Sequence, residues 1–409
     1  RDAQESRGLG DVYKRQAKTR RICYMEKKNI DWANIGFGYI KTDKRFVSNY
    51  KEGAWDDGVL TEDDKVVISE CAGVLQYAQT CFEGLKAYTT EQGKIVTFRP
   101  DLNGERMENS CKKLMMPVFP KEKFVDAVLK TVEANAAYVP PYGSGATLYI
   151  RPYMFGSNPV IGVKPATEYQ FRIFTTPVGP YFKGGAKPLT IRVSDVDRAA
   201  PHGTGDIKAG LNYAMSLFNI VDAHEHGYDE NMYLDPATRT YVEETGGANF
   251  IFVTKDGKVV TPKSGSILPS ITRRSLLTVA KDYFGLEVEE RPVAKAELKD
   301  MAECGLCGTA AVISPVGKIV DHGTEFIYPK NPSVLGYTLL PEKYRSRRIQ
   351  LYQYRDNKHR QCKYGKHNGS HNHIKYSFCP KPRAAFYQDV VIFPDLFCPH
   401  FIGKVCPLS

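Results

Sequence analysis

The sequence predicts an α/β (α+β) protein of two domains, a smaller N-terminal one and a larger C-terminal one. Three observations carry this prediction. Segments rich in β-branched and aromatic residues alternate with segments of helical periodicity. A glycine- and proline-dense stretch, 179–188, interrupts this pattern and is typical of an interdomain linker. A length of 409 residues with 42% hydrophobic content is enough for two buried cores.

The first expected domain covers residues 25–178. Two helices are expected, at 101–116 with Asp101 as N-cap, and at 121–137. The second helix repeats apolar residues at helical spacing, namely Phe124, Val125, Val128 and Val132. The strands expected from composition are 65–70, 94–100, 146–156 and 169–178.

The second expected domain covers residues 189–344. It begins with a strand, 189–195, and 231–261 reads as short strands with a hairpin turn at Asp256-Gly257. The expected helices are 208–226, 270–284 and 295–303. The first of these carries an apolar stripe that we expect to face a core, formed by Leu211, Met215, Phe218 and Val221.

The two ends do not match this body. Residues 1–24 lack apolar periodicity and contain acids, which favours a non-native leader before Met25 over an arginine-rich transit peptide. Residues 345–409 hold most of the histidines, with Cys362 and Cys379 near three of them. That cluster is either a zinc site or, as we favour, part of a poorly ordered tail.

Charge argues against a nucleic-acid ligand. The formal net charge is +10, but residues 1–24 carry seven Lys/Arg and three Asp/Glu, and residues 345–409 carry twelve and three. The body between them is left at about −3, without the basic excess that phosphate backbones require. No apolar run approaches the roughly 20 residues that span a bilayer, so no membrane partner is expected.

The ten cysteines show no disulfide-scaffold spacing, which favours reduced thiols and a cytoplasmic protein, or a mitochondrial one if the basic N-terminus is a transit peptide. Cys304 and Cys307 form one CxxC. It is compatible with a redox pair or half a zinc site, but two ordinary thiols are the default, and we expect no metal in the functional site.

Lys208, in "HGTGDIKAGLNYA", raises the question of chemistry. A lysine flanked by Ile207 and Leu211 either covers apolar surface with its stem or holds an amine ready to form an imine. At the start of the expected helix, the dipole would disfavour the charged form of the amine. That placement supports the second interpretation.

Further segments add to it. Glu244 stands in "VEETGGANFIF", where it is either a surface acid or a buried carboxylate. "ILPSITRRSLL" places Ser270 or Thr272 at a helix start, whose free N–H groups bind anions, and "CGTAAVI" adds a small-residue turn with a hydroxyl. Two phosphate-binding turns, a lysine and a carboxylate together indicate pyridoxal 5'-phosphate.

These segments resemble those of the branched-chain amino acid aminotransferases, which are fold-type IV pyridoxal-phosphate enzymes with a D-amino-acid-aminotransferase-like fold. The same resemblance, in order along about 30–344, extends to "LQYAQTCFEGLKAY", "FRPDLNGERMENS", "LYIRPYMFG" and "TPVGPYFKGG". The C-terminal segment of the family is missing here. In the mammalian members of the family, a CxxC follows the "GTA" turn. In this chain the CxxC, Cys304 to Cys307, precedes that turn, so the resemblance implies no redox switch.

The resemblance implies a set of cofactor residues. Lys208 would bond the cofactor and move the substrate proton, Glu244 would hold the pyridine nitrogen protonated, and Tyr213 would bind the phenolic oxygen. The phosphate would be held by Arg106, by the backbone of Ile271 and Thr272, and by Thr309. The alternative for Arg106 is a solvated helix arginine.

Substrate residues are implied in the same way. The backbone N–H groups of Thr309 and Ala310 would face the substrate carboxylate. The pocket would be lined by Phe37, Tyr77, Tyr149 and Arg151. Tyr149 and Arg151 are two apart on an expected strand and so share a face. Core packing is the alternative for the aromatics, but it explains Arg151 poorly.

The implied activity is reversible transfer of the amino group of L-leucine, L-isoleucine or L-valine to 2-oxoglutarate by a homodimer with a partner loop reaching into each site. The alternatives on the same fold are a D-amino acid aminotransferase and an aminodeoxychorismate lyase. A non-catalytic binding protein is disfavoured because Lys208, Glu244, Tyr213 and Arg106 are all present.

Overall fold

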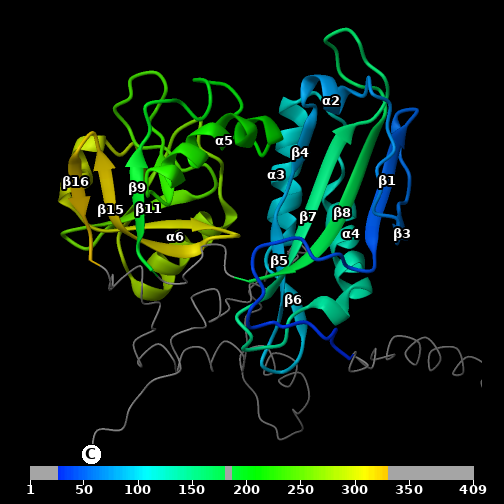
Figure 1. Cartoon of the computed structure of the whole chain (residues 1–409), viewed down its shortest axis with the longest axis horizontal. Coiled ribbons are helices and arrows are strands. Elements are labelled where there is room, and N and C mark those ends of the chain that lie inside the picture. The colour runs from blue at the N-terminus through cyan, green and yellow to red at the C-terminus, as the bar shows by residue number, and fades with distance from the viewer. Residues whose placement is uncertain (1–25, 180–186, 330–409) are drawn as a thin grey trace, which may run out of the picture.

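The computed structural model describes residues 26–179 and 187–329, which form two lobes, each built around its own sheet (Figure 1). The strands of the first sheet are β1 (Arg45–Lys51), β2 (Ala54–Trp55), β3 (Val59–Thr61), β4 (Thr80–Phe82), β5 (Leu85–Thr89), β6 (Ile95–Thr97), β7 (Thr147–Gly156) and β8 (Tyr169–Val178). Their order is β2-β1-β8-β7-β5-β6, with β3 beside β1 and β4 beside β7. Neighbouring strands in this sheet run antiparallel.

The second sheet is mixed. Its strands are β9 (Leu189–Val193), β10 (Glu230–Met232), β11 (Asn249–Thr254), β12 (Val259–Pro262), β13 (Val288–Arg291), β14 (Met301–Gly308), β15 (Val312–Asp321) and β16 (Thr324–Ile327). They follow the order β10-β9-β15-β14-β11-β12-β13, with β16 beside β15. Strand β9 pairs in parallel with β10 and β15, whereas β11, β14 and β15 pair antiparallel. Two sheets with helices against them confirm the expected α/β (α+β) class.

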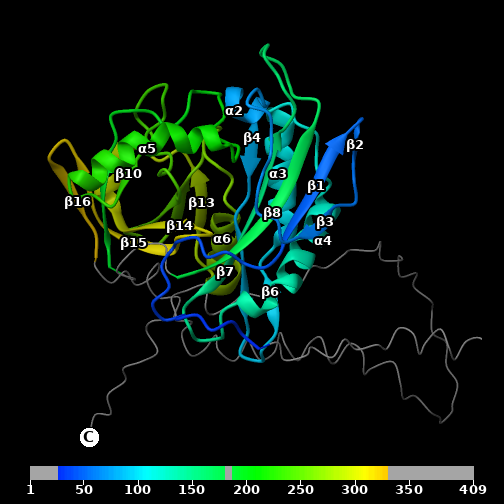
Figure 2. The ribbon, with the colours of Figure 1, turned by 45° about the vertical axis from the view of Figure 1, so that its right-hand side comes forward.

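Helices α3 (Pro100–Lys113) and α4 (Lys121–Ala134) pack against the first sheet (Figure 2). Helix α4 buries Phe124, Val128 and Val132 at helical spacing, as expected, while Val125 is only partly buried. Phe119 stacks on Phe171 of β8 with ring centroids 4.0 Å apart, which joins the helices to the sheet in one core.

Strands β7 and β8 are the longest strand pair of the first sheet. They pair over ten residues, from Thr147 opposite Val178 to Gly156 opposite Tyr169. Their bounds agree with the expected strands 146–156 and 169–178 because alternating β-branched and aromatic residues suit a long pleated pair.

Two expected elements are wrong. Residues 65–70 form no strand, and Val67 is 91% exposed, because the segment has no strand neighbour. The Arg172 guanidinium instead binds the carbonyls of Asp63 and Lys65. The expected helix 295–303 is only a short 3-10 turn, η2 (Lys295–Asp300), after which the chain enters β14 and pairs with β11.

Helix α5 (Gly210–Glu225) also differs from expectation, in its start and in its buried face. Its inward face carries Asn212, Ser216, Asn219 and Ala223. The expected core stripe faces outward instead, with Met215, Phe218 and Val221 61%, 78% and 54% exposed. The physical reason is that the Asn212 amide binds two carbonyls of the preceding loop and so turns the polar side of the helix inward.

The remaining helices are α2 (Gly73–Tyr77), α6 (Ile271–Phe284) and the 3-10 turn η1 (Ala136–Tyr138). Helix α6 agrees with the expected 270–284, and Ser270 caps it by accepting from the Arg273 N–H. The hairpin turn at Asp256-Gly257 is also present, with Gly257 at φ 86°. In the first sheet the last strand ends at Val178, and the second sheet begins at Leu189.

The domain boundaries themselves stay predictions. Most of the expected linker 179–188, the leader 1–24 and the tail 345–409 lie outside the described residues. The same holds for Cys362, Cys379 and the histidines near them.

Candidate active site

Lys208 lies at the junction of the two lobes, in an extended segment. The expected helix start is wrong by two residues, because α5 begins at Gly210 with Ala209 as its N-cap. Strand β4 holds this segment, since the Phe82 N–H donates to the Lys208 carbonyl at 3.0 Å. From α3, the Ser110 hydroxyl accepts the Lys208 N–H at 3.2 Å. The backbone of Lys208 is therefore attached to the first lobe, although it belongs to the second.

The Lys208 amine has two neighbours. Its Nζ donates to the Tyr213 hydroxyl at 2.7 Å, and it lies 4.8 Å from the centre of the Phe82 ring. Tyr213 is in the first turn of α5, and the Phe82 and Tyr213 rings are themselves 5.0 Å apart. These contacts favour a positioned amine over a lysine that merely covers apolar surface.

Glu244 is a buried carboxylate, 4% exposed, so the surface interpretation is wrong. Its Oε1 forms an ion pair with Arg198 Nη2 at 2.7 Å and accepts from the Leu268 N–H at 2.9 Å. Its Oε2 accepts from the Asn249 amide at 2.7 Å. Burial raises the pKa of Glu244, while the Arg198 guanidinium opposes that shift. A carboxylate has about four acceptor sites, so Oε2 retains capacity for one more donor.

Arg106 is buried on α3 and is not a solvated helix arginine. It forms a bidentate pair with Glu83, in which Nε and Nη2 lie 2.8 and 2.7 Å from the two carboxylate oxygens. Its Nη1 donates to the Pro269 carbonyl at 3.1 Å, directly before α6. Arg106 thus reaches the start of α6, but Glu83 neutralises its charge.

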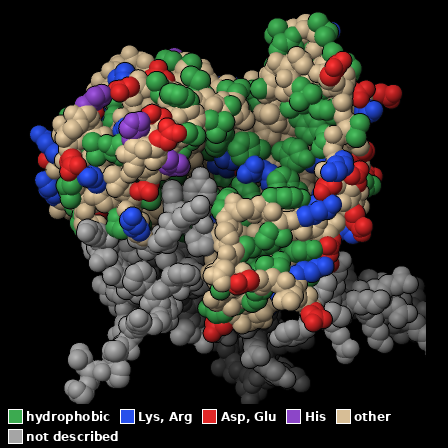
Figure 3. All heavy atoms as spheres, in the orientation of Figure 1, with side chains coloured by type: hydrophobic (Ala, Val, Ile, Leu, Met, Phe, Trp, Pro, Cys, Tyr) green, Lys and Arg blue, Asp and Glu red, His purple; other side chains and the backbone are tan. Residues whose placement is uncertain are grey.

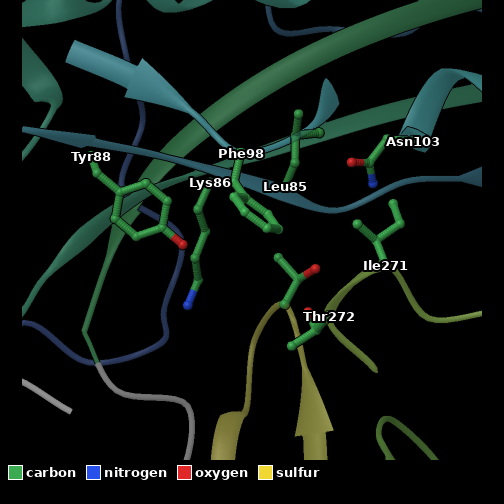
Figure 4. A pocket seen from close by; sticks show the side chains of 8 residues that line it. Leu85, Lys86, Tyr88, Phe98, Asn103, Ile271 and Thr272 are labelled. Atoms are coloured by element: carbon green, nitrogen blue, oxygen red, sulfur yellow. The ribbon is translucent and has the colours of Figure 1, made fainter. Parts of the chain in front are cut away.

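A small cavity lies where the lobes meet (Figure 4). From the second lobe it is lined by Ile271 and Thr272 at the start of α6 and by Thr309 in the turn between β14 and β15. The cavity brings together three of the residues that the resemblance assigns to the phosphate. The lining side chains from the first lobe are Leu85, Lys86, Tyr88, Phe98 and Asn103.

The turn after β14 is tight. Gly308 pairs with Val312, which leaves Thr309, Ala310 and Ala311 to reverse the chain. Val312 has φ 58°, a left-handed conformation that costs a β-branched residue of the order of 1–3 kcal/mol. Such strain is typical of turns that present their backbone to a ligand.

The side chains assigned to substrate form a second group. Arg151 Nη2 donates to the Tyr149 hydroxyl at 3.0 Å, and Phe37 meets the Tyr149 ring edge-on at 5.7 Å. The Arg151 guanidinium lies 4.6 Å from the centre of the Phe82 ring. Phe82 therefore contacts both this group and Lys208.

Tyr77 lies apart from that group. It sits on α2, is 40% exposed, and its hydroxyl donates to the Ile161 carbonyl. Within the described ranges, no contact links it to Lys208, Tyr149 or Arg151. The structure therefore brings Phe37, Tyr149 and Arg151 together but leaves Tyr77 outside.

The CxxC is neither a redox pair nor half a zinc site. Cys304 and Cys307 are buried, unpaired, and pack in different apolar clusters on opposite faces of β14. Burial raises the pKa of both thiols. Among residues 26–179 and 187–329, no three His, Cys, Asp or Glu side chains gather as metal ligands.

No helix in these ranges is long and apolar enough to cross a membrane.

Sequence reasoning missed several side chains at the site. Phe82, Glu83 and Lys86 all lie in "TCFEGLKAY", a segment singled out only as a whole. Arg198 stands ten residues before Lys208, with no local pattern to mark it. A buried charge is a tertiary property, so none of these could be assigned from spacing alone.

Comparison with known proteins identifies the family of the chain. The class IV amino-transferase family model matches residues 80–319, more than half of the chain. A branched-chain-amino-acid aminotransferase of Haemophilus influenzae is 50% identical over 312 residues, which cover 75% of this chain and 91% of that protein.

Solved structures agree as well. The branched-chain amino acid aminotransferase of Escherichia coli has a TM-score of 0.60 at 28% identity, covering 76% of this chain and 95% of that one. The Thermobaculum terrenum enzyme, solved in its PLP-form, has a TM-score of 0.58 at 25% identity, covering 78% and 97%. The chain therefore belongs to the class IV aminotransferases and, within them, to the branched-chain-amino-acid aminotransferases.

Proposed function

We propose that this protein reversibly transfers the amino group of L-leucine, L-isoleucine or L-valine to 2-oxoglutarate, with pyridoxal 5'-phosphate as its cofactor. One observation carries the proposal. The Phe82 ring lies within 5 Å of both the Lys208 amine and the Arg151 guanidinium. An amine for proton transfer and a cation for a substrate carboxylate therefore share one wall of the site.

The residues present fit the cofactor. Lys208 offers an amine, Glu244 a buried acceptor for a ring N–H, and Tyr213 a hydroxyl next to the amine. The start of α6, at Ile271 and Thr272, offers backbone N–H groups with Thr309 beside them. When bound, pyridoxal phosphate supplies an electron sink for the carbanion that forms when the substrate loses its Cα proton.

Lys208 would carry that proton on Nζ. The Tyr213 hydroxyl accepts a hydrogen bond from Nζ, and the Phe82 ring lies 4.8 Å from Nζ, so both groups orient the amine. The attachment of the Lys208 backbone to β4 and α3 limits how far the amine can move. Holding the base in place removes orientational entropy from the transfer step.

Arg198 would keep Glu244 ionised. Burial favours the neutral acid, but a guanidinium at 2.7 Å and the Leu268 N–H favour the carboxylate. An ionised Glu244 would hold a proton on the pyridine nitrogen, which strengthens the electron sink. Arg198 acts through Glu244 and is thus a positioning residue.

Two kinds of side chain must be accommodated in one pocket. Phe37 and Tyr149 offer apolar surface to leucine, isoleucine or valine. Arg151 offers charge to the second carboxylate of glutamate, and its Nε is buried with no acceptor among the described residues. The backbone N–H groups of Thr309 and Ala310 would face the α-carboxylate of either substrate.

We also propose that the protein acts as a homodimer. The outward face of α5 exposes Met215, Leu217, Phe218 and Val221, and Figure 3 shows hydrophobic side chains gathered over this helix. Large apolar groups on one exposed helix face favour a protein partner. Tyr77, which lies outside its own site, would serve the pocket of a second copy.

The unpaired buried thiols support a reducing compartment such as the cytoplasm.

A direct assay tests the activity. L-leucine with 2-oxoglutarate should yield glutamate, whereas D-alanine should not react, which separates this activity from that of a D-amino acid aminotransferase. Lys208→Ala should abolish turnover, and Lys94→Ala, an exposed lysine of the first lobe, should not. Normal turnover of leucine by Lys208→Ala would refute the proposal.

Light scattering with size exclusion tests the dimer, and an active monomer at micromolar concentration would contradict it.

A further inference from the structure

Lys86 is a buried lysine at the contact between the two lobes. It stands on β5, is 5% exposed, and points toward the cavity that Thr272 and Thr309 also line (Figure 4). Its only hydrogen bond within the described residues runs from Nζ to the Ala310 carbonyl, at a long 3.5 Å. A side chain of the first lobe thus reaches the β14–β15 turn of the second.

Nothing in the described part of the chain balances this charge. Among the described residues, no carboxylate lies within ion-pairing distance of Lys86, whereas Arg106 is matched by Glu83. A desolvated ammonium without a counter-charge is costly. Desolvation accordingly lowers the pKa of Lys86 to about 8.

The surroundings of Lys86 suit an oxyanion. The 14-residue helix α6 begins at Ile271, and in the described ranges neither Ile271 nor Thr272 donates its N–H to a protein acceptor. Thr272 and Thr309, which carry hydroxyls, line the same cavity. Its volume of about 20 Å³ has room for one water-sized group, so one oxygen of a larger anion would enter it.

We propose that Lys86 supplies the positive charge for an oxyanion, a phosphate monoester or a carboxylate, held between the start of α6 and the turn at Thr309 and Ala310. This inference rests on the proposed function, because it adds a binding residue to the same site. Lys86 would also link the first lobe to the anion-binding turn of the second. Arg106, already neutralised by Glu83, would supply hydrogen bonds rather than net charge.

The charge of Lys86 then depends on pH. The other titratable side chains facing it are Tyr88 on the same strand and Tyr149 on β7, opposite Lys86, and the Arg106–Glu83 ion pair is not part of the cavity lining. The start of α6 and the β14–β15 turn contribute no charged side chain to the cavity lining. An anion bound at Lys86 favours its ammonium form, so anion affinity should fall as pH rises above about 8.

The test uses two pairs of probes. Equilibrium dialysis of the full chain after its cofactor has been removed gives the dissociation constants of pyridoxal 5'-phosphate and of pyridoxal, which lacks the phosphate. Absorbance titration of the holoenzyme gives those of 4-methylvalerate and of 4-methylpentan-1-ol, which lacks the carboxylate. Each is measured at pH 7.5 and 9.5 for the wild type, Lys86→Met and Lys86→Arg. Lys94→Met, which removes an exposed lysine from the same lobe, is the control.

At pH 7.5, Lys86→Met should weaken one anionic probe about ten- to hundredfold and leave its neutral partner unchanged. Lys86→Arg should retain the affinity and lose the alkaline decline that the wild type shows, because a guanidinium stays charged. Selective weakening of the phosphate probe identifies a phosphate site. Selective weakening of 4-methylvalerate identifies a carboxylate site.

Equal affinity of Lys86→Met and the wild type for both anions would overturn the inference. Equal weakening of anions and neutral partners would show that Lys86 is only structural, and would overturn it as well. Circular dichroism shows whether Lys86→Met folds. If it does not, the test rests on two results: anion affinity should fall between pH 7.5 and 9.5 in the wild type, and it should not fall in Lys86→Arg. Binding is measured without turnover, so the dissociation constants can still be interpreted if the aminotransferase assay shows no activity.

Discussion

The Lys208 ammonium donates to the Tyr213 hydroxyl at 2.7 Å, across five residues of sequence and the start of α5. The extended backbone at Lys208 and the first helical turn at Tyr213 bring the two side chains to the same point. Neither an all-helical nor an all-extended segment would do so, because side chains five apart in a helix point about 140° apart. The break at Ala209 is therefore what creates the pair.

Tyr213→Phe tests the importance of this pair. The substitution removes a hydrogen bond to a charged group and keeps the ring against Phe82, so kcat/KM for leucine should fall roughly ten- to hundredfold. Tyr241→Phe, on an exposed tyrosine, is the control and should behave as wild type. Steady-state kinetics measure both. Equal rates for the two variants would show that the hydroxyl has no role in turnover.

Arg151→Ala separates the two substrates. Only glutamate presents a second carboxylate, so its KM should rise about ten- to hundredfold, while the KM for leucine should change little. The buried Nε of Arg151, which has no acceptor in the described part of the chain, supports this expectation. KM values for both substrates with the matching keto acids are the measurement. Equal rises would make Arg151 a structural residue.

Gly84→Ala should disturb the substrate pocket through packing. A Cβ at this position would collide with the Tyr149 hydroxyl, which accepts from Arg151. Overpacking of this kind typically costs about 1–3 kcal/mol, so Tm should fall and glutamate should bind more weakly. Gly38→Ala is the matched control, because nothing lies within 4 Å of a Cβ there. Identical Tm values for the two variants would contradict the expected clash.

Glu230→Gln should change how stability depends on pH. Burial raises the pKa of Glu230 from 4.5 to about 7, so the folded state keeps a proton that the unfolded chain loses between those values. The wild type should therefore lose up to roughly 3 kcal/mol of stability from this group as pH rises from 4.5 to 7. The amide cannot ionise and avoids this loss.

Urea unfolding at pH 5 and pH 8 measures the effect. The stability of Glu230→Gln relative to the wild type should increase from pH 5 to pH 8. Glu91→Gln, on an exposed loop, should show no such trend. A constant difference between Glu230→Gln and the wild type at both pH values would mean that Glu230 ionises as freely in the folded protein as in the unfolded one.

The sequence by itself determined the local elements and the identity of the chemistry. The composition of β7 and β8 predicts two strands, and Ser270 at the start of α6 predicts a helix. Each signal lies within about a dozen residues, and the structure confirms all three elements. The lysine, the carboxylate and the two turns expected to bind anions are likewise visible as short motifs, because their residue types and neighbours are local features.

Tertiary structure decided which side chains face inward and which charges balance. The apolar stripe of α5 predicts a buried face, but the carbonyls bound by Asn212 turn that face outward. The pairing of Arg106 with Glu83, and the lack of any such partner for Lys86 in the described ranges, depend on β4, β5 and α3 meeting in space. Burial and charge compensation are sums over neighbours distant in sequence, so no local pattern contains them.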